Sequence, residues 1–143
     1  MLGAHMEVSR VKEFSVYLAD RPGELAGVLE ALAAAGATVT AMSVVEVNGR
    51  GLVRLLAEPE DTVRRVCEGI GETGAGPVSE AEVLAVHLGG NPGVFRQVAV
   101  RLADAKVNVK YAYQSPAYNG TGARCILRVD EADRAEAIIR EVV

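Results

Sequence analysis

The sequence predicts an α+β fold made of two copies of one unit, in which two helices cover one face of a four-stranded antiparallel sheet. Three observations predict it. Stretches with the period of strands and of helices follow one another in a fixed order. A Pro-Gly turn twice joins a strand-like stretch to a helix-like one, and the whole pattern returns after seventy residues.

The repeat is direct over 26 positions. Residues 14–39 align without a gap to residues 84–109, and nine of the 26 pairs are identical. A gap of one residue then aligns Asn48-Gly49-Arg50-Gly51 with Asn119-Gly120-Thr121-Gly122. Because self-similarity at a fixed period marks a duplicated structural unit, elements recognised in one copy are expected in the other.

The first strand and helix of the first copy are predicted by periodicity. Residues 14–19 alternate between apolar and polar side chains, which is typical of a half-buried strand. From Pro22 to Ala35, apolar residues recur at helical spacing, and Gly36 stands where a residue in the left-handed conformation closes a helix. Proline suits the first turn of a helix because its missing N–H has no partner there.

The remaining elements complete the unit. Residues 38–47 are rich in β-branched side chains, and Asn48-Gly49-Arg50-Gly51 favours a tight hairpin into a strand at 52–57. Pro59 opens a second helix, and residues 76–88 are expected to hold the last strand of one unit and the first of the next. Right-handed crossovers turn this βαββαβ order into a ferredoxin-like sheet with both helices on one face.

We expect a first repeat over residues 12–80 and a second over 81–143, preceded by an N-terminal extension at 1–11 in which Gly3-Ala4-His5-Met6 resembles the remnant of an expression tag. After the last helix, at about 133–141, only two residues remain, so the second repeat lacks its fourth strand or borrows it. Because a unit of this size buries only about 60% of its unfolded surface, the repeats should pack together or dimerise.

Composition excludes several classes of partner. Half of the 143 residues are apolar, the formal net charge is −4, and the basic residues are scattered, which argues against nucleic acid. No apolar run reaches the ~20 residues that span a bilayer, so we expect no membrane partner. The two cysteines form no disulfide framework, and a cytoplasmic location is predicted.

Catalytic and metal motifs are not found in the sequence. Neither Cys67 nor Cys125 has a His or Asp at motif spacing, and His87 has no cluster of cysteines or carboxylates near it. Asn119-Gly120-Thr121-Gly122 suits a hairpin and not a phosphate loop. We therefore expect no enzyme, no cofactor and no metal.

Each repeat resembles an ACT domain, and the pair resembles small stand-alone tandem ACT proteins. The resemblance covers about residues 12–141 and combines the strand, the Pro-Gly loop, the apolar helix positions and the next strand, all present twice. The residues that carry it are Asp20-Arg21-Pro22-Gly23-Glu24-Leu25, Val28, Leu32, Gly36 and Val39 in the first copy, and Asn91-Pro92-Gly93-Val94-Phe95, Val98, Leu102 and Val109 in the second.

The resemblance implies a regulatory protein that senses an amino acid or similar small metabolite between paired domains, acts through a homodimer, and is coupled to a regulated enzyme or other protein. It places the ligand at the loop between the first strand and helix, completed by the second strand of a neighbouring domain. Carried onto this chain, the first half-site consists of the loop residues Asp20, Arg21, Pro22, Gly23, Glu24 and Leu25, together with Met42 and Ser43 from the strand segment Thr40 to Val44. The second half-site consists of the loop residues Asn91, Pro92, Gly93, Val94 and Phe95, together with Tyr111 and Tyr113 from the strand segment Lys110 to Gln114.

An amino acid needs donors for its carboxylate and acceptors for its ammonium group. Free N–H groups near Gly23 or Gly93 suit the first need, because a helix N-terminus attracts anions. A micromolar ligand of roughly ten heavy atoms needs about 0.8 kcal/mol per atom, so it must be enclosed at an interface. Gly90 replaces the acidic Asp20, so the two half-sites should differ. Candidate acceptors are Asp20, Asn91 and Ser43.

Plainer explanations stay open. Both Pro-Gly loops can simply start helices, and Tyr111 and Tyr113, which replace Ala41 and Ser43, can fill a core. The competing function is a ligand-independent module for protein interaction or oligomerisation, in which strand edges pair with another chain. A ferredoxin-like fold used for RNA or metal is the weakest alternative.

Overall fold

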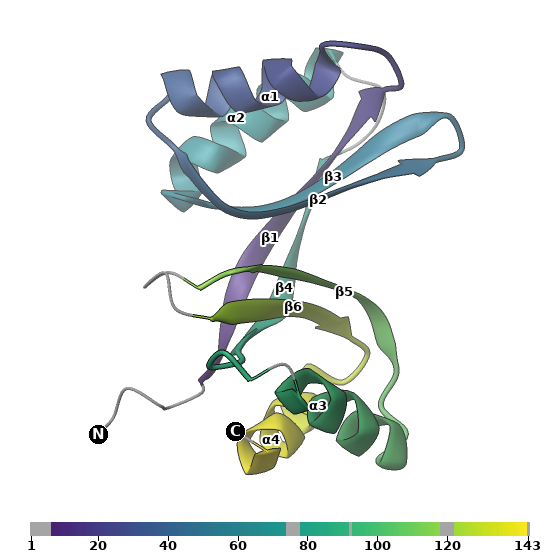
Figure 1. The fold of residues 1–143 in the computed structure, drawn as a ribbon. Coiled ribbons are helices and arrows are strands. Elements are labelled where there is room, and N and C mark those ends of the chain that lie inside the picture. The colour runs from purple at the N-terminus through teal and green to yellow at the C-terminus, as the bar shows by residue number, and fades with distance from the viewer. Residues whose placement is uncertain (1–6, 74–77, 92, 118–121, 143) are drawn as a thin grey trace. The chain divides into compact units, whose positions relative to one another are not determined.

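The computed structural model, drawn in Figure 1, describes residues 7–73, 78–91, 93–117 and 122–142. The chain forms two compact units. The N-terminal unit is Lys12–Ala81, and the C-terminal unit combines Met1–Val11 with Glu82–Val143. The elements are β1 (Val8–Ala19), α1 (Glu24–Ala34), β2 (Thr38–Val47), β3 (Arg50–Glu58), α2 (Glu60–Thr73), β4 (Val78–His87), α3 (Gly93–Asp104), β5 (Val109–Pro116), β6 (Ala123–Val129) and α4 (Ala132–Val142).

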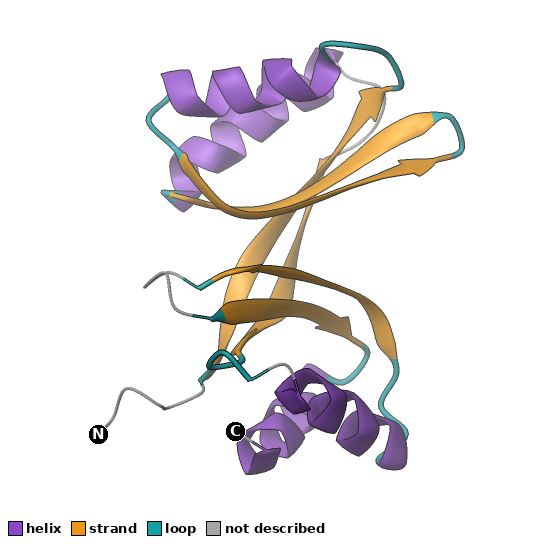
Figure 2. Cartoon of the chain, viewed as in Figure 1, coloured by secondary structure: helices purple, strands orange, loops and turns teal. Residues whose placement is uncertain are grey.

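The strand order within each unit confirms the ferredoxin-like fold. In the N-terminal unit the order is β2-β3-β1-β4, and in the C-terminal unit it is β5-β6-β4-β1. Both correspond to the second, third, first and fourth strand of the repeat. β3 pairs antiparallel with β1 and β2, and β6 pairs antiparallel with β4 and β5. Within each unit, the two helices lie together on one side of its strands (Figure 2).

The fourth strand of the C-terminal unit comes from the start of the chain. Val8–Val11, the first part of β1, belongs to this unit, whereas the rest of β1 belongs to the other. The N–H of His87 donates to the carbonyl of Glu7 at 2.8 Å, and Val8 is buried in the core of the unit. The structure therefore resolves the missing strand: it is borrowed, and residues expected to be an extension supply it.

The core of the N-terminal unit follows the predicted periodicity. Phe14, Val16 and Leu18 alternate along β1 and are buried, and they pack with Val28 and Leu32 of α1. These positions confirm the strand and the helical stripe. The other members of this cluster are Val53, Leu55, Ala57, Val63 and Cys67.

The C-terminal unit repeats this core with equivalent residues. Leu84 and Val86 of β4 and Leu88 directly after it take the places of the alternating residues of β1, and Val98 and Leu102 take those on the helix. Val8, Val94, Val107, Cys125, Leu127, Val129, Ala135 and Ile139 complete the cluster. Burial raises the pKa of the Cys67 thiol to about 11 and that of Cys125 to about 12, so both thiols stay protonated at neutral pH.

The first hairpin is tighter than the sequence pattern indicated. Asn48 and Gly49 alone form the turn, with φ of 51° and 80°, and Val47 pairs with Arg50. Two consecutive positive φ values give the turn type that matches the twist of antiparallel strands. The strand expected from residue 52 thus begins at Arg50. Of the equivalent turn in the second copy, residues 119–121 lie outside the described residues.

The first helix of each unit ends in the same backbone motif. Gly36, with φ of 83°, donates its N–H to Ala33, and the next residue donates to Leu32. Lys106 takes the same conformation, with φ of 60°, and donates to Ala103. These paired hydrogen bonds satisfy the last carbonyls of a helix, and glycine adopts the left-handed conformation without the steric cost that other residues bear. The predicted left-handed helix end at Gly36 is confirmed.

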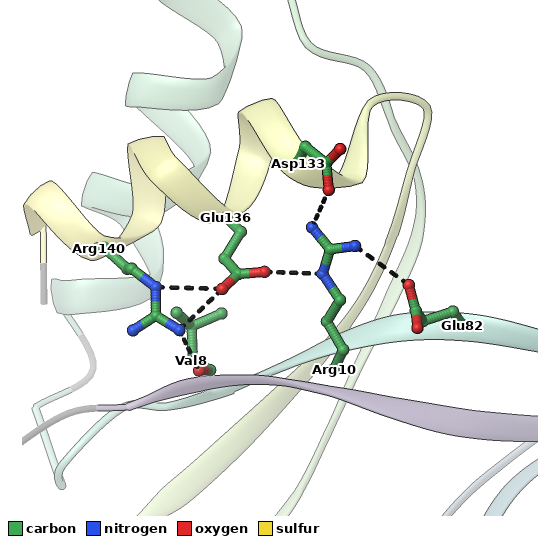
Figure 3. A network of polar contacts seen from close by, with 6 residues as sticks. All are labelled: Val8, Arg10, Glu82, Asp133, Glu136 and Arg140. Atoms are coloured by element: carbon green, nitrogen blue, oxygen red, sulfur yellow. Dashed lines mark hydrogen bonds and ion pairs between the residues drawn. The ribbon is translucent and has the colours of Figure 1, made fainter.

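An ion-pair network fixes the borrowed strand to α4 (Figure 3). The Arg10 guanidinium contacts Glu136 at 2.7 Å, Glu82 at 3.2 Å and also Asp133. Arg140 contacts Glu136 at 2.8 Å and donates to the carbonyl of Val8 at 3.3 Å. These two guanidinium groups hold the pKa of Glu136 below its usual range. A comparable contact in the N-terminal unit joins Arg64 of α2 to Glu80 of β4 at 2.6 Å.

No helix in the described part of the chain is both long and apolar enough to cross a bilayer.

The helix ends allow a test between the two copies. A Cβ at Gly36 meets nothing within 4 Å, so Gly36→Lys adds only backbone strain, and we expect it to lower the free energy of unfolding by about 1 kcal/mol. The reciprocal Lys106→Gly should stabilise slightly, because relief of strain exceeds the entropy gained by the unfolded chain. Urea unfolding measures both. Gly27→Ala inside α1 is the control and should stabilise by up to about 1 kcal/mol.

The Arg10 network predicts a pH dependence. Because the pKa of Glu136 is lowered in the folded state, its charge stabilises the protein fully above the unfolded value of about 4.5, and this stabilisation is lost as the pH falls through the folded value. Glu136→Gln should therefore lower the urea midpoint at pH 7, and the difference from the original protein should close in acid. Glu131→Gln, which removes an exposed pair at 3.5 Å, is the control. A constant difference across this pH range would contradict the assignment.

Candidate functional site

The loop between β1 and α1 is exposed and has no side-chain cap. Asp20, Arg21 and Gly23 are all exposed, and Gly23 precedes the helix with φ of 90°. Arg21 Nε forms an ion pair with Glu24 Oε2 at 3.1 Å across one turn. Among the residues that the structure describes, no side chain caps the start of the helix. This end of α1 therefore keeps the backbone donors that an anionic group needs.

The equivalent loop of the C-terminal unit closes its own helix end. Asn91 Oδ1 accepts the N–H of Gly93 at 2.9 Å, and the Asn91 carbonyl accepts that of Val94 at 3.2 Å. The expectation of a free N–H at Gly93 is therefore wrong, because the residue that replaces Arg21 is a capping side chain. Val94 is buried in the core, Phe95 packs against it, and Pro92 lies outside the described residues.

A cavity of about 260 Å³ opens beside this second loop. It lies within the C-terminal unit, where the end of β4 meets the start of β6, and the N–H of Leu88 donates to the carbonyl of Ala123 at 2.8 Å. The wall is close-packed backbone: a Cβ on Gly122 would lie 2.5 Å from the Gly90 nitrogen. The lining residues are Leu88, Gly90, Asn91, Gln114, Gly122 and Ala123.

The strand residues expected at the site divide between two faces. Gln114 pairs with Cys125, which belongs to the core beneath the helices, so it lies on the helix side with the cavity. Tyr111 and Tyr113 alternate with it and lie on the opposite face, where their rings stack with centroids 6.5 Å apart. The structure thus brings Gln114 to the loop and keeps both tyrosines away from this cavity.

The first copy divides in the same way. Met42 pairs with Leu55 and packs against the core beneath α1 and α2, whereas Ser43 pairs with Arg54 and lies on the other face of the sheet. Thr40 sits at a bulge in β2 and donates its hydroxyl to the carbonyl of Leu56 at 3.3 Å. Met42 therefore lies on the helix side of the sheet and Ser43 on the opposite side, so the two residues do not lie on one face.

Four residues of the cavity wall escaped sequence reasoning: Leu88, Gly90, Gly122 and Ala123. Gly90 enters the sequence analysis only as the residue that replaces the acidic Asp20, without a place in the ligand site. A signal was available, because the first and third strands are neighbours in a ferredoxin-like sheet, so the end of β4 must meet the start of β6. The glycine after the second hairpin turn then necessarily approaches the strand-to-helix loop.

The cavity offers amide chemistry and apolar surface. Asn91 and Gln114 each supply a carbonyl oxygen and an NH₂ group, and the six lining residues include no charged side chain. Such a wall can orient a small polar molecule without itself supplying a counter-charge. Among the described residues, no group of three or more His, Cys, Asp or Glu side chains is arranged to hold a metal ion.

Comparisons with known proteins agree with the fold. A family model described as an ACT domain pair matches residues 9–142. A protein of Bacteroides thetaiotaomicron is similar in structure, with a TM-score of 0.79 and 22% identity over 94% of this chain and 89% of that one. The ligand-free regulatory subunit of aspartate kinase from Thermus thermophilus is also similar in structure, with a TM-score of 0.66 and 18% identity over 95% of each chain.

A third similar structure is aspartokinase III of E. coli in complex with lysine and aspartate, with a TM-score of 0.57 and 13% identity over 96% of this chain and 31% of that one. The search of curated proteins found no match. At these identities the structural similarity concerns the fold.

The capped and uncapped loops predict different responses to the same substitution. Asn91→Ala removes a side-chain acceptor from the start of α3 and should lower the free energy of unfolding by about 1 kcal/mol. Arg21→Ala at the equivalent position removes only an exposed ion pair, so it should lower the free energy of unfolding by less than Asn91→Ala does. Urea unfolding of both variants, with Asn91→Asp to retain an acceptor, checks this. Equal losses at the two positions would contradict the capping role.

Proposed function

Because the chain belongs to the ACT domain pair family, whose model matches residues 9–142, we propose that it is a non-enzymatic regulatory protein that binds a small metabolite, an amino acid in first place. The observation that carries the proposal is the cavity of about 260 Å³ beside the β4–α3 loop. Pockets for drug-sized ligands measure roughly 300–1,000 Å³, so a cavity just below that range suits a smaller molecule.

The loop geometry supports an amino acid as the ligand. In the cavity, the amides of Asn91 and Gln114 supply donors and acceptors, and Leu88 supplies apolar surface. At the other loop, Asp20 offers a carboxylate near the uncapped start of α1, where an ammonium and a carboxylate can both be met. We propose that these loops form two half-sites of different affinity.

Enclosure supports a dimer. A micromolar ligand of about ten heavy atoms needs roughly 0.8 kcal/mol from each, which requires that little of it stays in water. The Gly90 turn is exposed, so a second protomer that covers the loop would complete the pocket. Ligand binding and dimerisation would then favour each other, which gives the protein a way to pass on occupancy.

The similar structures support the same class of role. One is a regulatory subunit of aspartate kinase and another is an aspartokinase bound to lysine and aspartate. By analogy, we propose that the partner of this chain is an enzyme or another protein of the cytoplasm whose activity the metabolite controls.

A ligand-independent interaction module is the second candidate. One observation favours it: Val44 and Val45 of β2 are 45% and 41% exposed, and β2 is the edge strand of its sheet. Apolar residues on an open edge invite pairing with another chain.

A thermal-shift screen of the twenty amino acids tests the proposal. A ligand at 100 times its Kd adds about 2.7 kcal/mol to stability, which for a chain of this size raises Tm by about 5–10 °C. Gln114→Ala should reduce that shift, and Val44→Ala, the equivalent position in the first copy, should preserve it.

The oligomeric state, measured by light scattering with and without the stabilising amino acid, separates the two candidates. Ligand-dependent assembly supports the sensor. A dimer that no amino acid stabilises, and that Val44→Asp disrupts, supports the interaction module and contradicts the sensor.

A further inference from the structure

The outer surface between α3 and α4 holds a second cavity of about 290 Å³, which shares no lining residue with the loop cavity. Both helices belong to the C-terminal unit, and all but one of the lining residues are exposed. We call this surface the α3–α4 groove. Its lining residues are Arg96, Gln97, Val100, Arg101, Glu141 and Val142.

Val100 gives the groove an exposed apolar side chain. Its side chain is 43% exposed, whereas Val98 and Leu102 on the same helix are buried in the core. Among the described residues, the other large apolar side chains exposed to this degree lie on the edge strand β2. Packing of the core does not require an apolar residue at position 100, because α3 packs against the sheet through its buried residues Val94, Val98 and Leu102.

Two arginines, Arg96 and Arg101, also line the groove. Arg101 contacts Glu141 at 3.4 Å, and because both side chains are about half exposed the pair is easily exchanged. Arg96 makes no ion pair with any other described residue. In a chain with a formal net charge of −4, a groove with two arginines and one glutamate departs from the general surface.

Comparison of the two copies shows that this surface is specific to the second. The shift of seventy residues places Arg96 and Arg101 opposite Ala26 and Ala31, and Val100 opposite Glu30. The two buried residues of α1, Val28 and Leu32, are matched by identical buried residues in α3, Val98 and Leu102. The two copies therefore share these inner positions and differ on the outer face, where the second copy has cationic and apolar residues and the first has small and acidic ones.

We propose that the α3–α4 groove docks an acidic segment of a partner protein, in which carboxylates flank one apolar side chain. The carboxylates would meet Arg96 and Arg101, and the apolar side chain would cover Val100. Charge complementarity selects this occupant, since exposed arginines favour bidentate contacts with carboxylates. The groove holds no aromatic side chain on which a nucleic acid base can stack. The inference goes beyond the metabolite site and does not depend on it.

Selection from a phage-displayed library of random 12-residue peptides, against the full chain without added amino acids, tests the proposal. The comparison is a triple variant that carries the residues of the first copy: Arg96→Ala, Val100→Glu and Arg101→Ala. Each exposed charge pair accounts for roughly a 2- to 5-fold change in Kd, and the apolar contact adds to this. Enriched peptides should contain Asp or Glu on both sides of an apolar residue. By fluorescence anisotropy they should bind the triple variant at least about tenfold more weakly.

Two controls sharpen the result. Arg134→Ala removes an arginine from α4 that pairs with Glu131 and does not line the groove, so peptide binding should not change. Added NaCl should weaken binding, because exposed charges are screened within about 8 Å at physiological ionic strength. Thermal unfolding of the triple variant verifies that it is folded.

The proposal is overturned if selection yields no peptide above background, if the enriched peptides are neutral or basic, or if the triple variant binds them equally well. It is also overturned if the groove mutations abolish self-association of the chain without affecting peptide binding, because the occupant is then a second copy. Since no amino acid is present, none of these outcomes depends on the metabolite site.

Discussion

The completion of each small sheet by a fourth strand beside its first is the constraint on which the rest of the structure depends. Units of about seventy residues bury little surface, and each needs a fourth strand beside its first. The C-terminal unit obtains it from Val8–Val11, and the contacts of Arg10 and Arg140 with Glu136 attach that segment to α4. In the N-terminal unit, Arg64 and Glu80 join the corresponding elements. Exposed ion pairs contribute little singly, but here several share their partners around a buried valine.

Duplication with divergence explains the differences between the units. The core residues Phe14, Val16, Leu18, Val28 and Leu32 have the same or similar apolar residues at the equivalent positions of the second copy, because packing tolerates little change in volume. Residues outside the cores were free to change. Asn91 caps a helix where Arg21 does not, Lys106 bears the conformation that Gly36 adopts freely, and Arg96 replaces Ala26 on an outer face. Two equal folds thus present unequal surfaces.

Much of the fold was predictable because its signals are local. Alternation at Phe14, Val16 and Leu18 is a property of six consecutive residues, and the Asn48-Gly49 turn is specified by two. The site was less predictable. The tyrosines were grouped with the loop by sequence likeness, yet Tyr113 and Gln114 are adjacent residues on opposite faces of β5, and only Gln114 lines the cavity beside the loop. Which face of a strand adjoins a loop depends on the partner strand and its register.

The sequence by itself determined the duplication, the order of strands and helices, the buried stripe of each element and the positions where the backbone turns. These follow from the periodicity of side chains and from the conformational preferences of glycine, proline and asparagine, which act over a few residues. Only the tertiary structure decided which segment supplies the last strand, that Asn91 occupies the Gly93 N–H, and that Gly122 closes on Gly90 to form a cavity wall. Those outcomes join residues from two to more than a hundred positions apart, and a pattern read along the chain does not specify how hydrogen bonds and close contacts are shared in space.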